Sequence, residues 1–447
     1  MTRDVAETRR RRWRWETLTG GGAILQQEGF RQLWLGRVLS HTGTNAVLFT
    51  LLVLAVRGTG TAASIKSALF VIAYILPTAA LGTISGVFVD RLPKNLVLTA
   101  MNIGRLLLML IILASGLGLW TIYGIALLLA ITSQFASPAE AAALPQLVRR
   151  DQLTTANSVN NLGGLVSQVL GFAVLPALFL NTVGARPLFF VAAVLYGAAA
   201  AVFLGIRQLG GREIDIDRSL DAVREVRKQF AQAWDTLSRD LAAYMSVIIV
   251  VLASAAGLVV VTLMPQFMED VLDIPVKHSI FVFLPAAVGV LAGLRLVQWL
   301  EHRLAKVWLV GTGFGLLTAA FVGLALVKPL GVVVEDLSPF GGTSARIVVT
   351  IVFSIVAAFS FSVVGVASRS LVNERMPLEI QGRVFAAQVV LTNLASIPPI
   401  LLAGVLAAVF GVEPVLLLFV IILVGVAGWT AARAAARPTI RSDVAED

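Results

Sequence analysis

Twelve apolar runs, each of 18 residues or more, constrain the fold of this chain more than any other feature. They cover residues 36–56, 65–88, 95–117, 120–143, 154–181, 187–206, 242–266, 279–299, 306–327, 347–371, 384–409 and 413–432. A helix needs about 20 apolar residues to cross a bilayer, whereas barrel strands alternate in hydrophobicity over about ten residues. Because these runs do not alternate, the sequence predicts an all-α membrane protein with twelve transmembrane helices.

Composition argues against a soluble enzyme. Charged residues make up 14% of the 447 residues and hydrophobic residues 57%, whereas an average soluble domain is about 25% charged. The chain has no cysteine, and none of its three histidines, His41, His278 and His302, falls in a metal-binding HExxH pattern. No phosphate-binding P-loop motif occurs. We therefore expect no catalytic residue, no metal site, no cofactor and no enzymatic activity.

The basic residues indicate the orientation of the chain. Six of the 35 Lys and Arg residues lie in alternate loops, Arg105 lies within a run, and the others lie on the opposite side of the membrane. Lys and Arg near a span resist translocation, so we expect a multi-pass protein of the cell membrane with both termini in the cytoplasm. The net charge of +9 is interpreted as this topology signal in contact with membrane lipids, not as a nucleic-acid surface.

One long polar stretch, residues 207–241, divides the spans into two sets of six. Its apolar residues recur every three or four positions, which predicts an amphipathic helix on the inner membrane surface. The expected parts are a basic cytoplasmic segment 1–29, a six-helix bundle 30–206, a cytoplasmic amphipathic linker 207–241, a second six-helix bundle 242–432 and a cytoplasmic tail 433–447.

The two sets of six spans repeat each other. ILPTAALGTISG at 75–86 in the second span aligns with FLPAAVGVLAG at 283–293 in the eighth, and LVRRDQL at 147–153 aligns with LVNERMP at 371–377. Each half has a proline followed by a Gly-xxx-Gly face, which permits close contact between helix backbones. Two pseudo-symmetric six-helix bundles of parallel topology would enclose a cavity near the membrane midplane, as in transporters.

The loop between the second and third spans carries the most specific motif. GVFVDRLPKN at 86–95 resembles the G-x-x-x-D-R-x-G-R-R motif of the major facilitator superfamily, with Pro93 and Asn95 as departures. The stretches at 137–157 and 374–386 resemble the branch that contains siderophore exporters and macrolide efflux permeases. The resemblance covers nearly the whole chain and implies a twelve-helix transporter that works by alternating access.

The motif implies a conformational latch on the cytoplasmic side. A carboxylate at a helix end can accept hydrogen bonds from the free amides at the start of another helix. In the family this Asp, here Asp90, caps the eleventh span, here beginning near Gly382 and Arg383, when the cytoplasmic side is closed. The other expected latch residues are Gly86, Arg91, Lys94 and Glu140; an ordinary solvated loop is the alternative.

Polar residues within the spans are the candidates for a substrate cavity. His41 and Asn45 form a polar stripe with Ser40 and Thr44, although hydrogen bonding between helices explains this stripe equally well. Arg105 could touch substrate or form a structural pair, for example with Glu140. The expected cavity residues are His41, Asn45, Arg105, Gln134, Asn160, Gln168, Gln388 and Asn393.

These residues favour export of an amphipathic small molecule, drug-like or siderophore-like, by a secondary transporter that acts as a monomer. The fifth span departs from the family's antiporter pattern, which argues against proton-driven drug export. No Asp or Glu lies near the middle of any span, so a proton-coupled carrier would have to use His41, whose pKa could cross the working range, or the pair Asp90 and Glu140. Two alternatives remain open: a lipid or lysolipid transporter with lateral substrate entry, and a membrane sensor or structural protein of the same fold that transports nothing.

Overall fold

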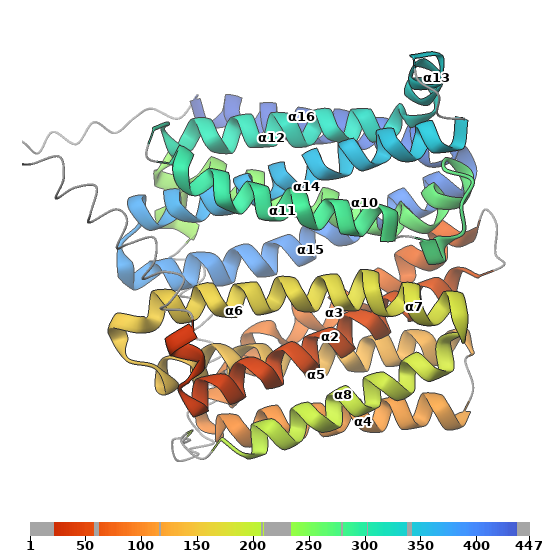
Figure 1. Cartoon of the computed structure of the whole chain (residues 1–447). Helices are drawn as coiled ribbons and strands as arrows, with labels where there is room; N and C mark the ends of the chain where they lie inside the picture. Colours follow the sequence, from red (N-terminus) through yellow and green to blue (C-terminus); the bar gives the residue numbers. More distant parts are fainter. Residues whose placement is uncertain are drawn as a thin grey trace, which may run out of the picture. The chain divides into compact units, whose positions relative to one another are not determined.

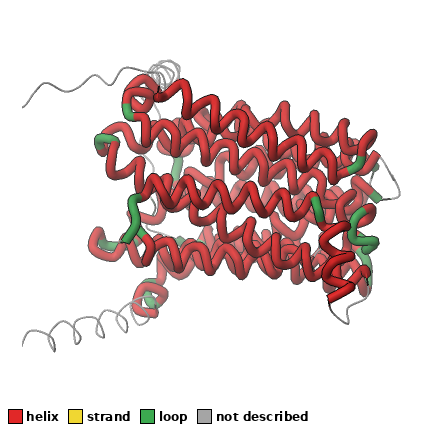
Figure 2. Tube along the Cα trace, turned by 90° about the horizontal axis from the view of Figure 1, so that it is seen from above, coloured by secondary structure: helices red, strands yellow, loops and turns green. Residues whose placement is uncertain are grey.

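Helices make up the regular structure of this protein. The computed structural model describes residues 22–57, 62–115, 118–206, 209, 234–278, 280–301, 303–337 and 342–435, and within these ranges there are twelve helical spans long and apolar enough to cross a membrane (Figure 1; Figure 2). A backbone in hydrocarbon must satisfy its hydrogen bonds internally, so apolar runs of this length become helices. The predicted fold class is confirmed.

The chain forms two compact units. The N-terminal unit comprises Met1–Arg57, Leu69–Val226 and Lys277–Phe283, and the C-terminal unit comprises Gly58–Ala68, Arg227–Val276 and Leu284–Asp447. Each unit therefore includes the first residues of a span that the sequence assigns to the other bundle. Most of the predicted segment 1–29, linker 207–241 and tail 433–447 lies outside the described residues.

Small residues on the first span let the N-terminal unit pack closely. Its elements are α2 (Glu28–Val56), most of α3 (Ala63–Arg91), α4 (Lys94–Ser115), α5 (Leu119–Leu147), α6 (Leu153–Gln168), η3 (Val169–Val174), α7 (Leu175–Thr182) and α8 (Ala185–Leu204). A Cβ atom at Gly36 would lie 2.7 Å from the ring of Phe203, and one at Gly43 would lie 3.2 Å from the ring of Tyr196. Both rings are fully buried. The missing side chains of α2 thus make room for the aromatic side chains of α8.

The fifth span is interrupted by a π-helix, η3. Pro176 follows at the start of α7, and a proline has no N–H with which to continue the regular hydrogen-bond ladder. Gly171 of η3 lies against α2, where a Cβ atom would come within 2.4 Å of the Cβ of Asn45 and 2.8 Å of the carbonyl oxygen of Thr42. The late proline that sets this span apart from the family pattern therefore accompanies a change of helix type.

The C-terminal unit packs around α14. Its elements are α10 (Leu241–Asp270), most of α11 (Ile280–Leu300), α12 (Lys306–Ala325), α13 (Val327–Leu337), α14 (Gly342–Arg375), α15 (Leu378–Phe410) and α16 (Val412–Ala435). Gly289 and Gly293 of α11 lie directly on the backbone of α14. A Cβ atom would come within 2.3 Å of the carbonyl oxygen of Ile355 in the first case and 2.6 Å of that of Phe359 in the second.

The repeat does not produce the same contact in both units. Pro77 and Pro285 lie inside α3 and α11 as expected. At Gly82, however, the nearest described atom to a Cβ would be Oε1 of Gln134 at 3.7 Å, and none lies within 4 Å at Gly86. The expected backbone contact is present in the C-terminal unit, and the expectation is wrong for these two glycines among the described residues.

The helices extend beyond the apolar runs from which they were predicted. The tenth span, expected at 347–371, is α14 from Gly342 to Arg375, because helix formation does not stop where hydropathy falls. The short helix α13, which stands at the end of the C-terminal unit in Figure 1, was not expected. Its Val332 and Val333 are exposed and its Val327 is fully buried.

The contact between α11 and α14 predicts different effects for two glycine-to-alanine substitutions. Gly289→Ala should lower the free energy of unfolding by about 1–3 kcal/mol, because the new methyl group would overlap a backbone that cannot move freely. In Gly311→Ala of α12 the methyl group enters open space, so the free energy of unfolding should stay the same or rise by about 0.5–1 kcal/mol. Unfolding in mixed micelles with increasing SDS measures both, and equal effects would contradict the close contact.

Candidate functional site

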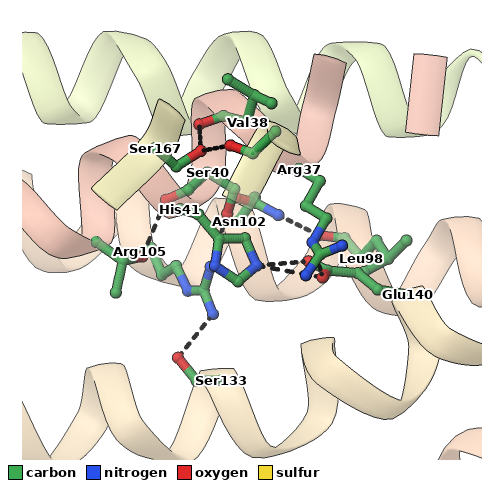
Figure 3. A network of polar contacts seen from close by, with 12 residues as sticks. Arg37, Val38, Ser40, His41, Leu98, Asn102, Arg105, Ser133, Glu140 and Ser167 are labelled. Carbon is green, nitrogen blue, oxygen red and sulfur yellow. Dashed lines mark hydrogen bonds and ion pairs between the residues drawn. The ribbon is translucent and has the colours of Figure 1, made fainter. Parts of the chain in front are cut away.

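A cluster of charged and polar side chains lies inside the N-terminal unit (Figure 3). Helix α2 contributes Arg37, Ser40 and His41, whose spacing of three and four residues puts them on one face of a helix. Helices α4 and α5 supply Asn102, Arg105, Thr132, Ser133 and Glu140. Ionisable groups within membrane spans are costly and mark functional sites by default. We call these eight residues the polar cluster.

Glu140 is the acidic centre of the polar cluster. Its side chain is 8% exposed, and it lies seven residues before the end of α5. Both carboxylate oxygens are 3.2 Å from Nε2 of His41, and Oε2 is also 3.1 Å from Nε of Arg37. One carboxylate therefore bridges two basic side chains one turn apart on α2.

Arg105 is held by hydroxyl groups. Its guanidinium donates to Oγ of Ser40 at 2.7 Å, to Oγ1 of Thr132 at 3.0 Å and to Oγ of Ser133 at 3.0 Å. The side chain is 3% exposed, and its guanidinium carbon lies 5.9 Å from the ring centroid of Tyr196. Three neutral acceptors and an aromatic ring thus solvate a buried cation, and the pairing with Glu140 that the sequence left open is not among its direct contacts.

The polar stripe of α2 bonds to neighbouring helices of the same unit. Ser40 donates to Oδ1 of Asn102 at 2.6 Å, Tyr196 donates to Oγ1 of Thr44 at 3.1 Å, and Asn45 donates to the carbonyl oxygen of Ser167 at 3.3 Å. Each residue of the stripe therefore takes part in a bond between helices. This supports the structural alternative for Ser40 and Thr44 and leaves His41 and Asn45 with part of their surface exposed.

The expected latch residues have different surroundings. Lys94 is buried and donates to the carbonyl oxygens of Val89 at 2.7 Å and Leu92 at 2.9 Å. The ion pairs of Glu140 are with Arg37 and His41, so the structure places it in the polar cluster. Arg91 and Gly86 are half-buried, Arg383 is half-buried and Gly382 is exposed; the side chain of Asp90 lies outside the described residues. The latch stays a prediction.

Among the described residues, no hydrogen bond joins the other expected cavity residues to the polar cluster. Gln134 donates to Oγ1 of Thr78 at 2.6 Å, which joins α5 to α3. On α6, Asn160 is half-buried and Gln168 is exposed; on α15, Gln388 is half-buried and Asn393 donates to the carbonyl oxygen of Val389 in its own helix. That these residues share one cavity with His41 stays a prediction.

Arg37 is the member of the polar cluster that sequence reasoning missed. It lies near the start of the first apolar run and was counted with the cytoplasmic basic residues. The signal was available, because Arg37 and His41 are four residues apart and so lie on the same helix face. Thr132, Ser133 and Asn102 were also missed, since neutral residues in a span give no signal until the buried Arg105 requires acceptors.

Charge is distributed unequally between the units. Three charged residues are buried among the described side chains, Lys94, Arg105 and Glu140, and all belong to the N-terminal unit. In the C-terminal unit the buried polar groups on α14 are hydroxyls, such as Ser360 and Ser362, which donate to carbonyl oxygens four residues back in their own helix.

Comparison with known proteins decides the family. Residues 33–399 match the family model described as Major Facilitator Superfamily. The chain belongs to this superfamily. Two relatives, uncharacterized MFS-type transporters of Mycobacterium bovis and Mycobacterium tuberculosis, are each 36% identical to it over 126 residues. That stretch covers 27% of this chain and 29% of each relative. The names of these relatives indicate no substrate.

Solved structures share the superfamily fold. A nucleoside transporter, NupG, superposes with a TM-score of 0.66 at 14% identity, covering 91% of this chain and 99% of its own. A bacterial homolog of the human lysosomal transporter Spinster gives 0.64 at 13% identity over 92% of this chain and 97% of its own. The predicted resemblance to the superfamily is confirmed, and the protein is a multi-pass membrane protein of this family of secondary transporters.

The contacts of Arg105 predict that another cationic side chain cannot replace the arginine without loss of stability. In Arg105→Lys the ammonium is a compact charge that cannot reach three separate hydroxyl groups at once. We expect the free energy of unfolding to fall by about 1–3 kcal/mol, the cost of lost bonds to a buried charged group. Unfolding by SDS measures this, with Arg31→Lys, an exposed arginine of α2, as the control. Equal stability of the two variants would contradict the role of the three hydroxyls.

Proposed function

We propose that this superfamily member exports an amphipathic small molecule across the cell membrane by alternating access of a central cavity between two six-helix halves. Its termini lie in the cytoplasm, it acts as a monomer, and protons drive it. The observation that carries the proposal is the contact between His41, Glu140 and Arg37 within the apolar helices α2 and α5. Histidine acts as a proton shuttle in proteins, and we assign that role to His41 in contact with Glu140.

The chemistry around the polar cluster favours an amphipathic substrate. A pocket of mostly apolar helices with a few polar groups suits a molecule with a large apolar body and a small polar head. The half-buried Asn45, one turn along α2 from His41, and the exposed Gln168 of α6 would supply neutral hydrogen bonds to such a molecule. A sugar would need many more such groups than the spans provide.

A flux assay tests proton coupling directly. In proteoliposomes loaded with a panel of amphipathic dyes, we expect an imposed pH gradient to change the rate of flux through the wild type. In His41→Gln, which keeps a polar side chain but cannot titrate, the flux should no longer respond to the gradient. His278→Gln, a change outside the polar cluster, is the matched control.

The outcomes of this assay separate the alternatives. Flux that ignores pH and competes with lysophospholipid would favour the lipid transporter with lateral entry. Absence of flux for every compound would favour a sensor or structural protein of the same fold. A gradient response that survives in His41→Gln would remove His41 from the coupling site.

The proposed latch makes a separate prediction. Because the chain contains no cysteine, single cysteines at Gln388 and Asn393 can report solvent access without interference. Asp90→Asn removes a charge that would stabilise a helix start by about 0.3–1 kcal/mol, so labelling from the cytoplasmic side should quicken about two- to fivefold. The control is Asp151→Asn, an exposed carboxylate paired with Arg149. Equal labelling rates would exclude the latch.

A further inference from the structure

We propose that Arg37 and His41 bind an oxyanion of the transported molecule, such as a carboxylate or phosphate, and that this anion binds together with a proton. The inference rests on the proposed function, since it names the chemical class of substrate for the same protein. It assigns a ligand to Arg37, which otherwise serves only as a partner of Glu140, and a second role to His41.

The charges of the polar cluster do not balance. Arg37 and Arg105 are both cationic, and Glu140 is the only carboxylate in contact with either guanidinium among the described residues. With His41 neutral the cluster carries one net positive charge, and with His41 protonated it carries two. An unbalanced charge within membrane spans is costly, and a bound anion would reduce that cost.

Arg37 has donors to spare. Its Nε lies 3.1 Å from Oε2 of Glu140 as an ion pair without hydrogen-bond geometry, so Nε is a buried donor with no acceptor in the described part of the chain. The side chain is 23% exposed. The two terminal nitrogens of a guanidinium present parallel N–H groups that match the two oxygens of a carboxylate or phosphate. The free edge of Arg37 can therefore take an oxyanion while Nε remains with Glu140.

The contact of His41 with Glu140 uses one ring nitrogen and leaves the other for a ligand. A carboxylate can only accept, so the tautomer that bonds to Glu140 has its proton on Nε2, which lies 3.2 Å from both oxygens. In that tautomer Nδ1 is the other ring nitrogen, for which the described residues provide no partner. The ring is 36% exposed, so both a proton and an anion can reach it. When protonated, Nδ1–H is a further donor one helical turn from Arg37.

Among the described residues of the helices that pack on α2, no other acid competes for these donors. Helix α5 brings Glu140, and α8 brings Tyr196, bonded to Thr44, and Arg186 at its distant first turn. Elements α6, η3 and α7 contain no charged or titratable residue, and α4 reaches α2 through Arg105. An anionic group of the ligand would therefore complement the positive charge and the donors of Arg37 and His41. Since anion and proton then favour each other, each increases the affinity for the other by the same factor.

Binding to the full chain in phosphatidylcholine nanodiscs tests this. The probes are pyrenebutanesulfonate, an oxyanion that stays ionised across the range, and pyrenebutanol, which has the same body and no charge. After subtraction of binding to empty nanodiscs, fluorescence anisotropy should give an affinity for the sulfonate about tenfold higher at pH 6 than at pH 8.5. The affinity for the alcohol should not depend on pH.

Three variants assign the effect to individual residues. Arg37→Gln should lower the affinity for the sulfonate about tenfold at both pH values and leave the affinity for the alcohol unchanged. In His41→Gln the affinity for the sulfonate should be the same at pH 6 and pH 8.5, and equal to the weaker value of the wild type at pH 8.5. Arg31→Gln, which removes an exposed arginine of the same helix, should behave as the wild type. Binding of the alcohol confirms that each variant is folded.

The two sources of an oxyanion are distinguished by lipid composition. If the headgroup of an anionic lipid occupies the site, phosphatidylglycerol in the nanodisc should compete with the sulfonate in the wild type but not in Arg37→Gln; if a free anion occupies it, the lipid should have no effect. Equal, pH-independent affinities for sulfonate and alcohol would overturn the proposal, as would loss of both in Arg37→Gln. Binding needs no flux, so sulfonate binding without any transport would contradict the proposed function alone.

Discussion

A charged side chain among apolar helices is stable only when polar atoms surround it, and this constraint organises the N-terminal unit. Arg105 meets it with hydroxyls from α2 and α5 and the ring of Tyr196 from α8. Four helices are thereby fixed around one guanidinium. The bond to Ser40 also sets the rotation of α2, which brings the next residue, His41, to face Glu140. The position of the titratable pair thus depends on a neighbouring cation that does not touch it.

The two units achieve close helix packing by different means. In the N-terminal unit, Gly36 and Gly43 accept the aromatic rings of α8, whereas in the C-terminal unit Gly289 and Gly293 accept the backbone of α14. A ring can shift within its pocket more easily than a carbonyl group fixed in a helix. The internal repeat has therefore preserved the order of the spans and the prolines but not the contacts of the glycines.

The sequence predicts the fold well because a single quantity, the length of the apolar runs, decides it. Runs of 18 residues or more leave a helix as the only stable conformation in a bilayer, and the described residues contain a helix at each of the twelve. The boundaries were less accurate, since helices such as α14 continue into polar residues at both ends. The short helix α13 was missed because it is too short to span and its hydropathy merges with that of α12.

The site was harder to predict than the fold, since side-chain pairing depends on helix rotation. His41, Arg105 and Glu140 were recognised as exceptional residues within or near spans, but their partners were not. Arg37 appeared to be an ordinary interfacial cation, and only the direction of α2 shows that it shares Glu140 with His41. A span that is apolar on all sides does not show which side faces which neighbouring helix. The sequence therefore does not reveal which polar residues of neighbouring spans meet.

The unequal distribution of charge has a consequence for the proposed mechanism. The buried charges of the described residues lie in the N-terminal unit, while the buried polar side chains of the C-terminal unit are neutral, such as Ser360, bonded within its own helix, and Gln266, which donates to the carbonyl oxygen of Ala407. Under the proposed function, a proton or an anion that arrives at His41 would change the interactions of α2, α4 and α5, which supply the polar cluster. Because the buried ionisable groups of the described residues belong to one unit, the energy of binding would act first on that set of helices.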